Sequence, residues 1–182
     1  MWIILGVLVL LAVVLISMYN RLVRLRQGVR EGWSSIDTEL RRRYDLIPNL
    51  VETVKGYASH ESETLENVIR ARNSAMSAGG DAASQVEAQN QITGALRQIF
   101  ALSEAYPDLK ANQNFQDLQR QLEETETRIS QSRRFYNATV RELNTSVESF
   151  PNSLIAGSFG FKSEPYFEID EPFARAPVQV RF

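Results

Sequence analysis

Side chains that could carry catalysis or bind a metal ion are sparse in this sequence. The 182 residues include one histidine, His60, and no cysteine, which excludes disulfides and thiolate chemistry. The chain also lacks the motifs G-x-x-x-x-G-K-[ST], G-x-S-x-G, H-E-x-x-H and G-x-G-x-x-G, so the usual phosphate-binding, nucleophile and metal sites cannot be assembled. We therefore predict that the protein is not an enzyme and has no catalytic, cofactor-binding or metal-binding residue.

Two acidic groupings could still be considered as sites. His60 with Glu61 and Glu63 could suggest a metal site, but one imidazole near a predicted helix start is more often a surface or capping residue. Glu123, Glu124 and Glu126 could suggest a carboxylate cluster, but their spacing fits the solvated face of a helix better. In both places we favour a surface or capping role over a metal-binding or catalytic site.

Polar residues also interrupt the apolar positions of two predicted helices, around Tyr44 and around Tyr136. Because a buried charge needs a partner, Asp45 is expected to meet Arg133 or Arg134 if the two helices are antiparallel neighbours. Such a pair would help to fix their register, and recognition of a protein partner is the alternative. The residues predicted to set register or form an interface are Trp33, Arg43, Tyr44, Asp45, Pro48, Arg134, Tyr136 and Asn137.

The first predicted element of the chain is a membrane segment. Residues 2–18 carry no charged side chain, and at about 1.5 Å per residue they cover about 25 Å, near the lower limit for a hydrocarbon core of about 30 Å. We predict a retained anchor. A cleaved signal peptide would need a basic stretch before the apolar run and a small-residue site after it, and a third reading is an apolar helix buried in an oligomer. The anchor is predicted to use Trp2, Ile3, Ile4, Leu5, Val7, Leu8, Leu10, Leu11, Val14, Leu15 and Met18.

Four arginines follow this segment closely: Arg21, Arg24, Arg26 and Arg30. Because basic residues mark the cytoplasmic side of a span, we predict a single-pass protein of the cell membrane with its N-terminus outside and its bulk in the cytoplasm. The arginines could also bind anionic lipid headgroups, or they could serve only as the topological signal on a solvated face.

The remainder is predicted to be all-α, with the anchor (1–19) continuing into a cytoplasmic antiparallel bundle of about four helices (20–150), two of them long. The first helix is expected to kink around Tyr44 to Pro48 and to continue beyond the kink, because its apolar stripe persists. If the helix is continuous, Gly28 and Gly32 mark a close helix approach or a weak point. Further helices are expected at 60–77, with Ser59 or Ser62 as N-cap, at 83–106, and from Asn112 as N-cap to 150, the last with coiled-coil-like spacing.

Residues 151–182 differ in character, because they hold four of the six prolines together with many aromatic residues. Proline opposes helix formation and the aromatic residues oppose free disorder. We expect an extended strap, packed on its own bundle or on a neighbouring subunit.

Charge is distributed unevenly along the chain. Residues 21–60 hold eight Lys or Arg against five Asp or Glu, whereas residues 61–182 hold twelve against seventeen. No part has the strongly basic surface that binding of phosphate backbones needs, so nucleic acid is excluded as a partner.

Long stretches of the sequence resemble the LemA family of bacterial membrane proteins. The resemblance rests on residues 19–61, 105–144 and 150–170, which include the ordered strings RRRYDLIPNLVETVKGYA and LEETETRISQSRRFYN. It implies an N-terminal single-pass anchor followed by a cytoplasmic helical bundle, and it implies no enzymatic activity.

Together these features lead us to expect a non-enzymatic, membrane-anchored helical protein that self-associates as a scaffold or organiser of the membrane. Membrane lipids and further copies of the chain are the expected partners. The alternative is a monomeric or dimeric tether that holds a cytoplasmic protein partner at the membrane.

Overall fold

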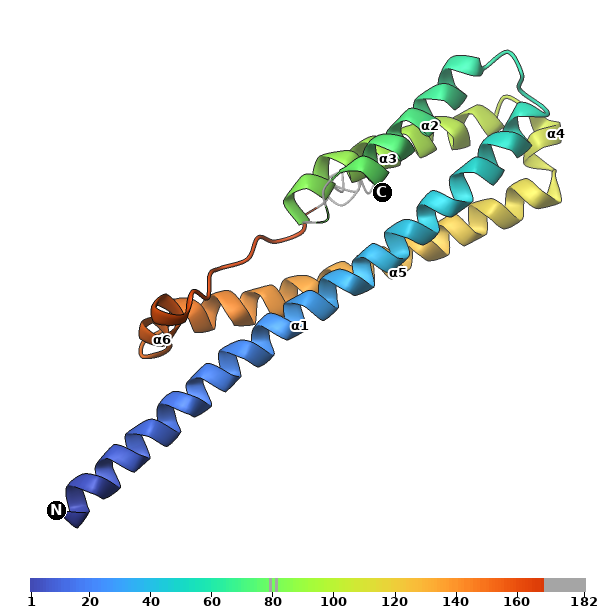
Figure 1. The fold of residues 1–182 in the computed structure, drawn as a ribbon. Helices are drawn as coiled ribbons and strands as arrows, with labels where there is room; N and C mark the ends of the chain where they lie inside the picture. Colours follow the sequence, from blue (N-terminus) through green and yellow to red (C-terminus); the bar gives the residue numbers. More distant parts are fainter. Residues whose placement is uncertain (79, 81, 169–182) are drawn as a thin grey trace, which may run out of the picture. The chain divides into compact units, whose positions relative to one another are not determined.

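The computed structural model describes residues 1–78, 80 and 82–168, and this part of the chain is all-α without a strand, as predicted (Figure 1). It forms two compact units, unit 1 from Met1–Arg42 with Glu124–Tyr166, and unit 2 from Arg43–Glu123 with the chain from Phe167. The helices are α1 (Trp2–Lys55), α2 (Ser62–Ser77), α3 (Ala82–Ser103), α4 (Pro107–Lys110), α5 (Gln113–Glu148) and α6 (Asn152–Phe159).

Helix α1 confirms the predicted continuation of the apolar segment into the bundle. It runs without interruption for 54 residues and passes through Pro48. In unit 1 its buried residues recur at steps of three, four and seven, which is the spacing of one helix face. They pack with a similar stripe of α5, and the two sets are Leu22, Val29, Ile36 and Leu40 from α1, and Ile129, Tyr136, Val140 and Leu143 from α5.

The two helices of unit 1 are antiparallel and approach most closely at a glycine. Gly28 lies opposite Thr139 and Gly32 lies opposite Tyr136, so the residue numbers rise on α1 as they fall on α5. A Cβ atom at Gly32 would be 3.1 Å from the Tyr136 Cα atom, whereas at Gly28 the nearest atom would be 3.9 Å away. The close approach expected from these glycines is therefore located at Gly32.

Alanine substitutions at these two glycines are expected to have opposite effects. Gly28→Ala should raise the free energy of unfolding by about 0.5–1 kcal/mol, because alanine is the better helix former and its methyl group meets only an ordinary contact. Gly32→Ala should lower it by about 1 kcal/mol, because overpacking against the α5 backbone costs about 1–3 kcal/mol and exceeds the propensity gain. Thermal unfolding of both variants in mild detergent measures the difference. Equal stabilisation by both substitutions would contradict the close approach.

Unit 2 contains α2 and α3 side by side (Figure 1). The predicted cap of the last long helix is confirmed, since Asn112 Oδ1 accepts a hydrogen bond from the Phe115 N–H at 3.0 Å. The predicted caps of α2 are wrong. Glu61 is the N-cap residue and makes no side-chain capping bond, because a turn closed by the Glu61 N–H to Ala58 O delays the helix past Ser59 and leaves Ser62 as its first residue.

A side chain of α2 compensates for Pro48. Proline has no N–H with which to reach the carbonyl four residues earlier, which is that of Tyr44. Arg72 Nε donates a hydrogen bond of 2.7 Å to Tyr44 O instead. The helix therefore continues through Pro48 with this carbonyl satisfied.

This compensation predicts that the effects of Arg72 and Pro48 are coupled. Arg72→Met should lower the free energy of unfolding by about 1–2 kcal/mol, because it leaves the Tyr44 carbonyl without that donor. In a Pro48→Ala background the alanine N–H can serve the same carbonyl, so the cost of Arg72→Met should fall by about half or more. A double-mutant cycle from denaturant unfolding measures the coupling. Additive effects would show that Arg72 does not stabilise the protein through the Tyr44 carbonyl.

The segment after α5 departs from the extended strap that was predicted. Residues 152–159 form helix α6, because Pro151 stands at its N-cap and Gly160 ends it in the left-handed conformation (φ 71°). Prolines thus flank this helix instead of interrupting it. The extended part begins only after Gly160, and residues 169–182, with Pro172 and Pro177, lie outside the described residues.

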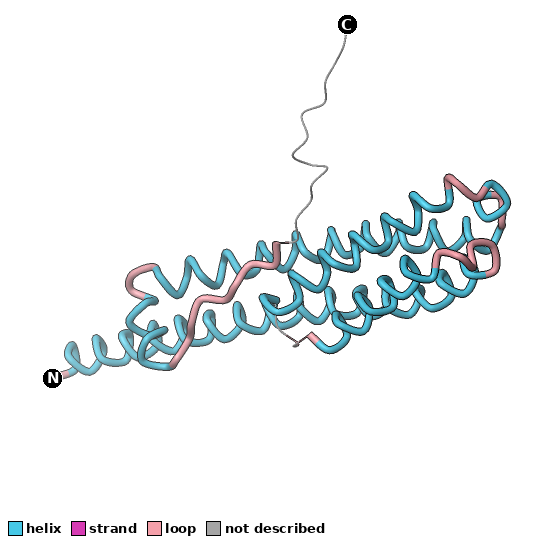
Figure 2. The backbone as a smooth tube through the Cα atoms, turned by 90° about the horizontal axis from the view of Figure 1, so that it is seen from above, coloured by secondary structure: helices cyan, strands magenta, loops and turns pink. Residues whose placement is uncertain are grey.

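The extended part packs on its own unit up to Tyr166 (Figure 2). Asn144 Nδ2 donates to Glu164 O at 2.9 Å, and the Glu164 N–H donates to Asn144 Oδ1 at 2.8 Å. The Tyr136 hydroxyl then donates to Pro165 O at 2.9 Å. These bonds hold the segment antiparallel along α5, which agrees with the first of the two placements considered for it.

Candidate membrane anchor and buried polar cluster

The predicted anchor residues share one environment. Every residue from 1 to 17 is exposed, and Met18 is half-buried. Within the described residues, α1 is the one helix long and apolar enough to cross a membrane, and its apolar window has no buried residue. Length and composition are the basis for this assignment, and a signal sequence meets the same criteria, so retention of the segment stays a prediction.

Just beyond the apolar segment, α1 packs against α6 and the chain that follows it. The Tyr19 ring lies edge-on to Phe159 and Phe161, with centroids 4.9 Å and 5.7 Å away. Leu22 is fully buried with Ala156 and Phe161. The segment that follows the last long helix therefore returns to the point where α1 leaves its apolar stretch.

The four predicted headgroup arginines are not equivalent. Arg21, Arg24 and Arg30 are exposed, as a lipid-binding or topological role requires. Arg26 is half-buried, and its guanidinium carbon lies 4.7 Å from the centre of the Phe161 ring, within cation–π distance. The sequence analysis missed this contact because Phe161 is 135 residues away along the chain.

The predicted register residues divide between the two units. In unit 1 the Trp33 ring lies edge-on to Tyr136 at 5.7 Å, Asn137 is half-buried and Arg134 is exposed. In unit 2 Arg43 and Tyr44 are buried, whereas Asp45 and Pro48 are exposed. The expected pairing of Asp45 with Arg133 or Arg134 stays a prediction. Among the residues that the structure describes, Arg43 is the one charged side chain that is buried.

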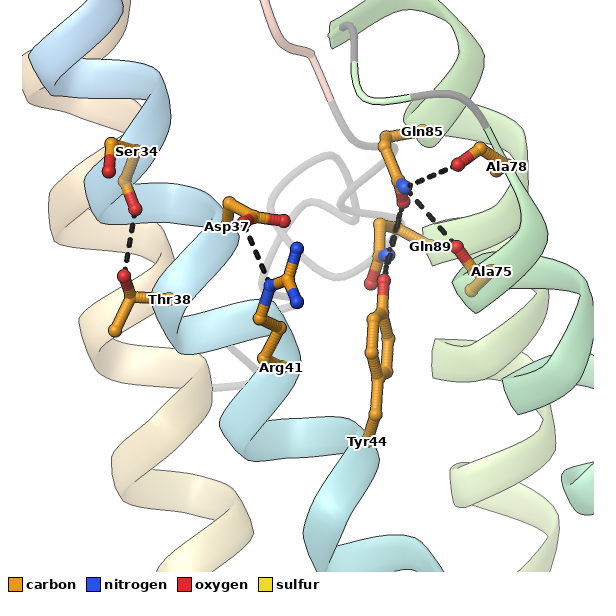
Figure 3. A network of polar contacts seen from close by, with 9 residues as sticks. All are labelled: Ser34, Asp37, Thr38, Arg41, Tyr44, Ala75, Ala78, Gln85 and Gln89. Atoms are coloured by element: carbon orange, nitrogen blue, oxygen red, sulfur yellow. Dashed lines mark hydrogen bonds and ion pairs between the residues drawn. The ribbon is translucent and has the colours of Figure 1, made fainter.

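Arg43 belongs to a buried polar cluster in unit 2. The side chain is 1% exposed, and its two terminal nitrogens donate to Gln89 Oε1 at 3.3 Å and to Thr93 Oγ1 at 2.9 Å. Gln89, which is fully buried, also donates to the Tyr44 hydroxyl and to Gln85 Oε1 (Figure 3). Gln85 Nε2 reaches the carbonyl oxygens of Ala75 and Ala78. Side chains of α1 and α3 and the end of α2 are thereby joined.

The sequence analysis missed both glutamines of this cluster. Gln85 and Gln89 continue the apolar stripe of α3 toward its start, since buried Ile92, Leu96 and Ile99 follow Gln89 at steps of three, four and three. Polar residues in register with a buried stripe are the signal that could have found them. The hydrogen bonds of the cluster link α1, α3 and the end of α2, which is the contribution of a structural network.

Unit 2 also has a groove of about 490 Å³ between the end of α1 and α2. Val51, Leu65 and Ile69 supply apolar surface, and Lys55, Glu66 and Arg70 supply charges of both signs. An apolar floor with a charged rim can accept the apolar face of an amphipathic helix.

The two acidic groupings considered in the sequence do not assemble into sites. His60 is exposed, and Glu61 accepts a hydrogen bond of 3.3 Å from the Tyr106 hydroxyl. Glu123, Glu124 and Glu126 are all exposed on α5. Over residues 1–78, 80 and 82–168, there is no group of three or more histidine or acidic side chains that could hold a metal ion.

Known proteins with similar sequences match most of this chain at 23% to 24% identity. The Protein LemA of Metamycoplasma hominis is 24% identical over 152 residues, which cover 84% of this chain and 69% of the relative. Magnetosome protein MamQ 2 of Paramagnetospirillum magneticum is 24% identical over 189 residues, and MamQ of Magnetospirillum gryphiswaldense is 23% identical, each covering 90% of this chain and 69% of the relative. None of these relatives is named for a catalytic activity.

These relatives and the exposed apolar helix support a bacterial, membrane-associated protein. The sequence model of the LemA family matches residues 32–182, which is most of the chain and includes the α1 stripe from Ile36 onward, the stripe of α5 and the segment after α5. The resemblance found in the ordered strings is thereby confirmed, and the chain belongs to the LemA family.

Proposed function

We propose that this chain is a non-enzymatic, single-pass membrane protein whose copies associate and organise the bilayer around them. The observation that carries the proposal is helix α1, which runs without a break from an exposed apolar segment into a packed unit. Each copy presents apolar residues to lipid at one end of this helix and a folded unit to water at the other.

Hydrophobic mismatch supports self-association. Residues 2–18 cover about 25 Å as a helix, which is less than a hydrocarbon core of about 30 Å. A short span thins the bilayer locally, and the cost per copy falls when several spans share one thinned region. Copies therefore gather, and their common thinned region bends or reshapes the membrane.

The exposed arginines support the proposed orientation. Arg21, Arg24 and Arg30 lie directly beyond the apolar segment and are solvent-accessible, and basic residues next to a span favour the cytoplasmic side. The N-terminus lies outside the cell membrane and the helical units lie in the cytoplasm.

A second function, tethering of a cytoplasmic protein, is favoured by the groove of unit 2. Its apolar residues Leu65 and Ile69 and its charged rim fit an amphipathic helix of a partner. In this alternative the anchor localises the partner and the protein itself stays monomeric or dimeric.

The mass of the full chain in mild detergent separates the two functions. A large and homogeneous assembly, measured by light scattering with correction for bound detergent, supports the organiser. The assembly should persist in an Ile69→Lys variant, since the proposed organiser does not use the groove as an interface between copies. A monomer or dimer at native-like concentration contradicts the organiser and leaves the tether.

A further inference from the structure

Helix α6 leaves large apolar side chains uncovered at one end of unit 1. Phe150 is 80% exposed, Leu154 is 64% exposed and Phe159 is 60% exposed. Leu154 lies two residues before Ala156, about 200° around the helix, so it points away from the packed side on which Ala156 is buried. Phe159 lies about 140° from Leu154 around the helix, beside Tyr19. With Phe150, these side chains leave apolar surface on more than one side of this end of unit 1, which suits an apolar medium.

The antiparallel register of α1 and α5 shows where these residues lie along the axis of α1, relative to the apolar segment. Gly28 pairs with Thr139 and Gly32 pairs with Tyr136. Continuing the same antiparallel register places Phe150 level with Met18, which is the last residue of the apolar segment. Phe159 contacts Tyr19 directly, with ring centroids 4.9 Å apart. The uncovered side chains therefore stand where α1 leaves its apolar stretch.

This level is also where the bilayer boundary falls. In the thinned bilayer of the proposed function the hydrocarbon core ends with the apolar segment at Met18, so the headgroup region begins beside Tyr19. Aromatic rings are favoured at this depth, where their apolar faces meet acyl chains and their edges meet headgroups.

Charged groups around α6 suit a lipid surface. Arg21, Arg24 and Lys162 are exposed in the same part of unit 1, and cations at this depth attract anionic headgroups. Glu148 is nearby and accepts a hydrogen bond of 2.9 Å from Ser163. Phe159 thus adjoins Tyr19, the residue next to the apolar segment, and three basic residues are exposed in the same part of the unit.

We propose that α6 is a second membrane contact, in which Phe150, Leu154 and Phe159 insert into the lipid interface beside the span. The inference rests on the anchor of the proposed function and deepens it. A helix inserted on one side of the bilayer widens the headgroup layer of that leaflet. Each copy therefore has an inserted helix beside its short span. The inserted helix and the span act together in thinning and bending the membrane.

Site-directed spin labelling tests the proposal directly, because the chain contains no cysteine. Single variants Phe150→Cys, Leu154→Cys and Phe159→Cys of the full chain are labelled with a nitroxide and reconstituted in vesicles of phosphatidylethanolamine and phosphatidylglycerol. Collisions with oxygen, which concentrates in lipid, are compared with collisions with a water-soluble nickel chelate. Leu15→Cys serves as the control in the span, and Arg128→Cys, exposed on α5, serves as the control in water.

The proposal predicts a loss of nickel collisions and a gain of oxygen collisions at the three α6 sites relative to Arg128→Cys. Water-like accessibility at these sites, with Leu15→Cys in lipid, overturns the second contact and leaves the anchor intact. Low accessibility to both reagents, with spin–spin broadening that disappears on dilution with unlabelled protein, means that a second copy covers the surface and also overturns it. Water-like accessibility at Leu15→Cys overturns the anchor and the inference together. Unchanged circular dichroism spectra and unfolding temperatures establish that each variant is folded.

Discussion

Replacing Gln89 with leucine is expected to lower the free energy of unfolding by about 3 kcal/mol, which corresponds to a fall in Tm of about 6–12 °C. Gln89 is fully buried and bonds with Arg43, Tyr44 and Gln85. Leucine fills similar space but removes an acceptor from a buried guanidinium and a donor from a buried hydroxyl. Leaving such groups unsatisfied costs more than the hydrogen bonds themselves contribute.

Gln98→Leu provides the matched control, because Gln98 lies on the same helix and is exposed. Its effect should stay within about 0.5 kcal/mol. The double variant Arg43→Met with Gln89→Leu should recover part of the loss, since removing the buried charge removes its need for an acceptor. Thermal unfolding by circular dichroism in mild detergent measures all three. A Gln89→Leu variant as stable as the control would mean that the cluster does not stabilise unit 2.

Two arginines in the middle of the apolar segment are expected to abolish stable membrane insertion. Leu8→Arg with Leu11→Arg should cost about 5–7 kcal/mol, because each arginine near the centre of a span costs about 2.5–3.5 kcal/mol. The equilibrium between inserted and uninserted chain then shifts by several orders of magnitude. The measurement is the fraction of the full chain that stays in the membrane pellet after alkaline carbonate extraction.

A variant with Ser34→Arg and Thr38→Arg controls for the added charge. Both residues are exposed on α1 beyond the apolar segment, so this variant should stay in the pellet as the native chain does. If the Leu8→Arg and Leu11→Arg variant also stayed there, residues 2–18 would not be the membrane anchor and the units themselves would hold the protein at the membrane.

The long helices could be predicted from the sequence because their apolar stripes are regular. The stripe of α1 persists across Pro48, and the stripe of α5 begins directly after Asn112, whose side chain is a strong capping signal. Both features are local, so they need no knowledge of what packs against them. The same holds for the exposed apolar segment, which is defined by composition alone.

The parts that could not be predicted depend on contacts between distant residues. Arg72 replaces the donor that Pro48 lacks, and no local pattern connects the two. Gln85 and Gln89 look like ordinary solvent-exposed glutamines until they are seen to share a face with Ile92 and Ile99. The prolines of residues 151–182 favour an extended chain in the sequence, but Pro151 precedes α6, where a proline is favourable, so the composition does not reveal this helix.

Energy transfer between copies in vesicles tests the central claim, self-association at the membrane, most directly. Two samples of the full-length Arg128→Cys variant are labelled, one with a donor dye and one with an acceptor dye, and are reconstituted together. The proposed organiser predicts energy transfer that persists when lipid is increased about tenfold and falls when unlabelled protein is added, because the copies stay associated. Transfer that disappears on dilution with lipid would show that the copies meet only by crowding, and would contradict the account.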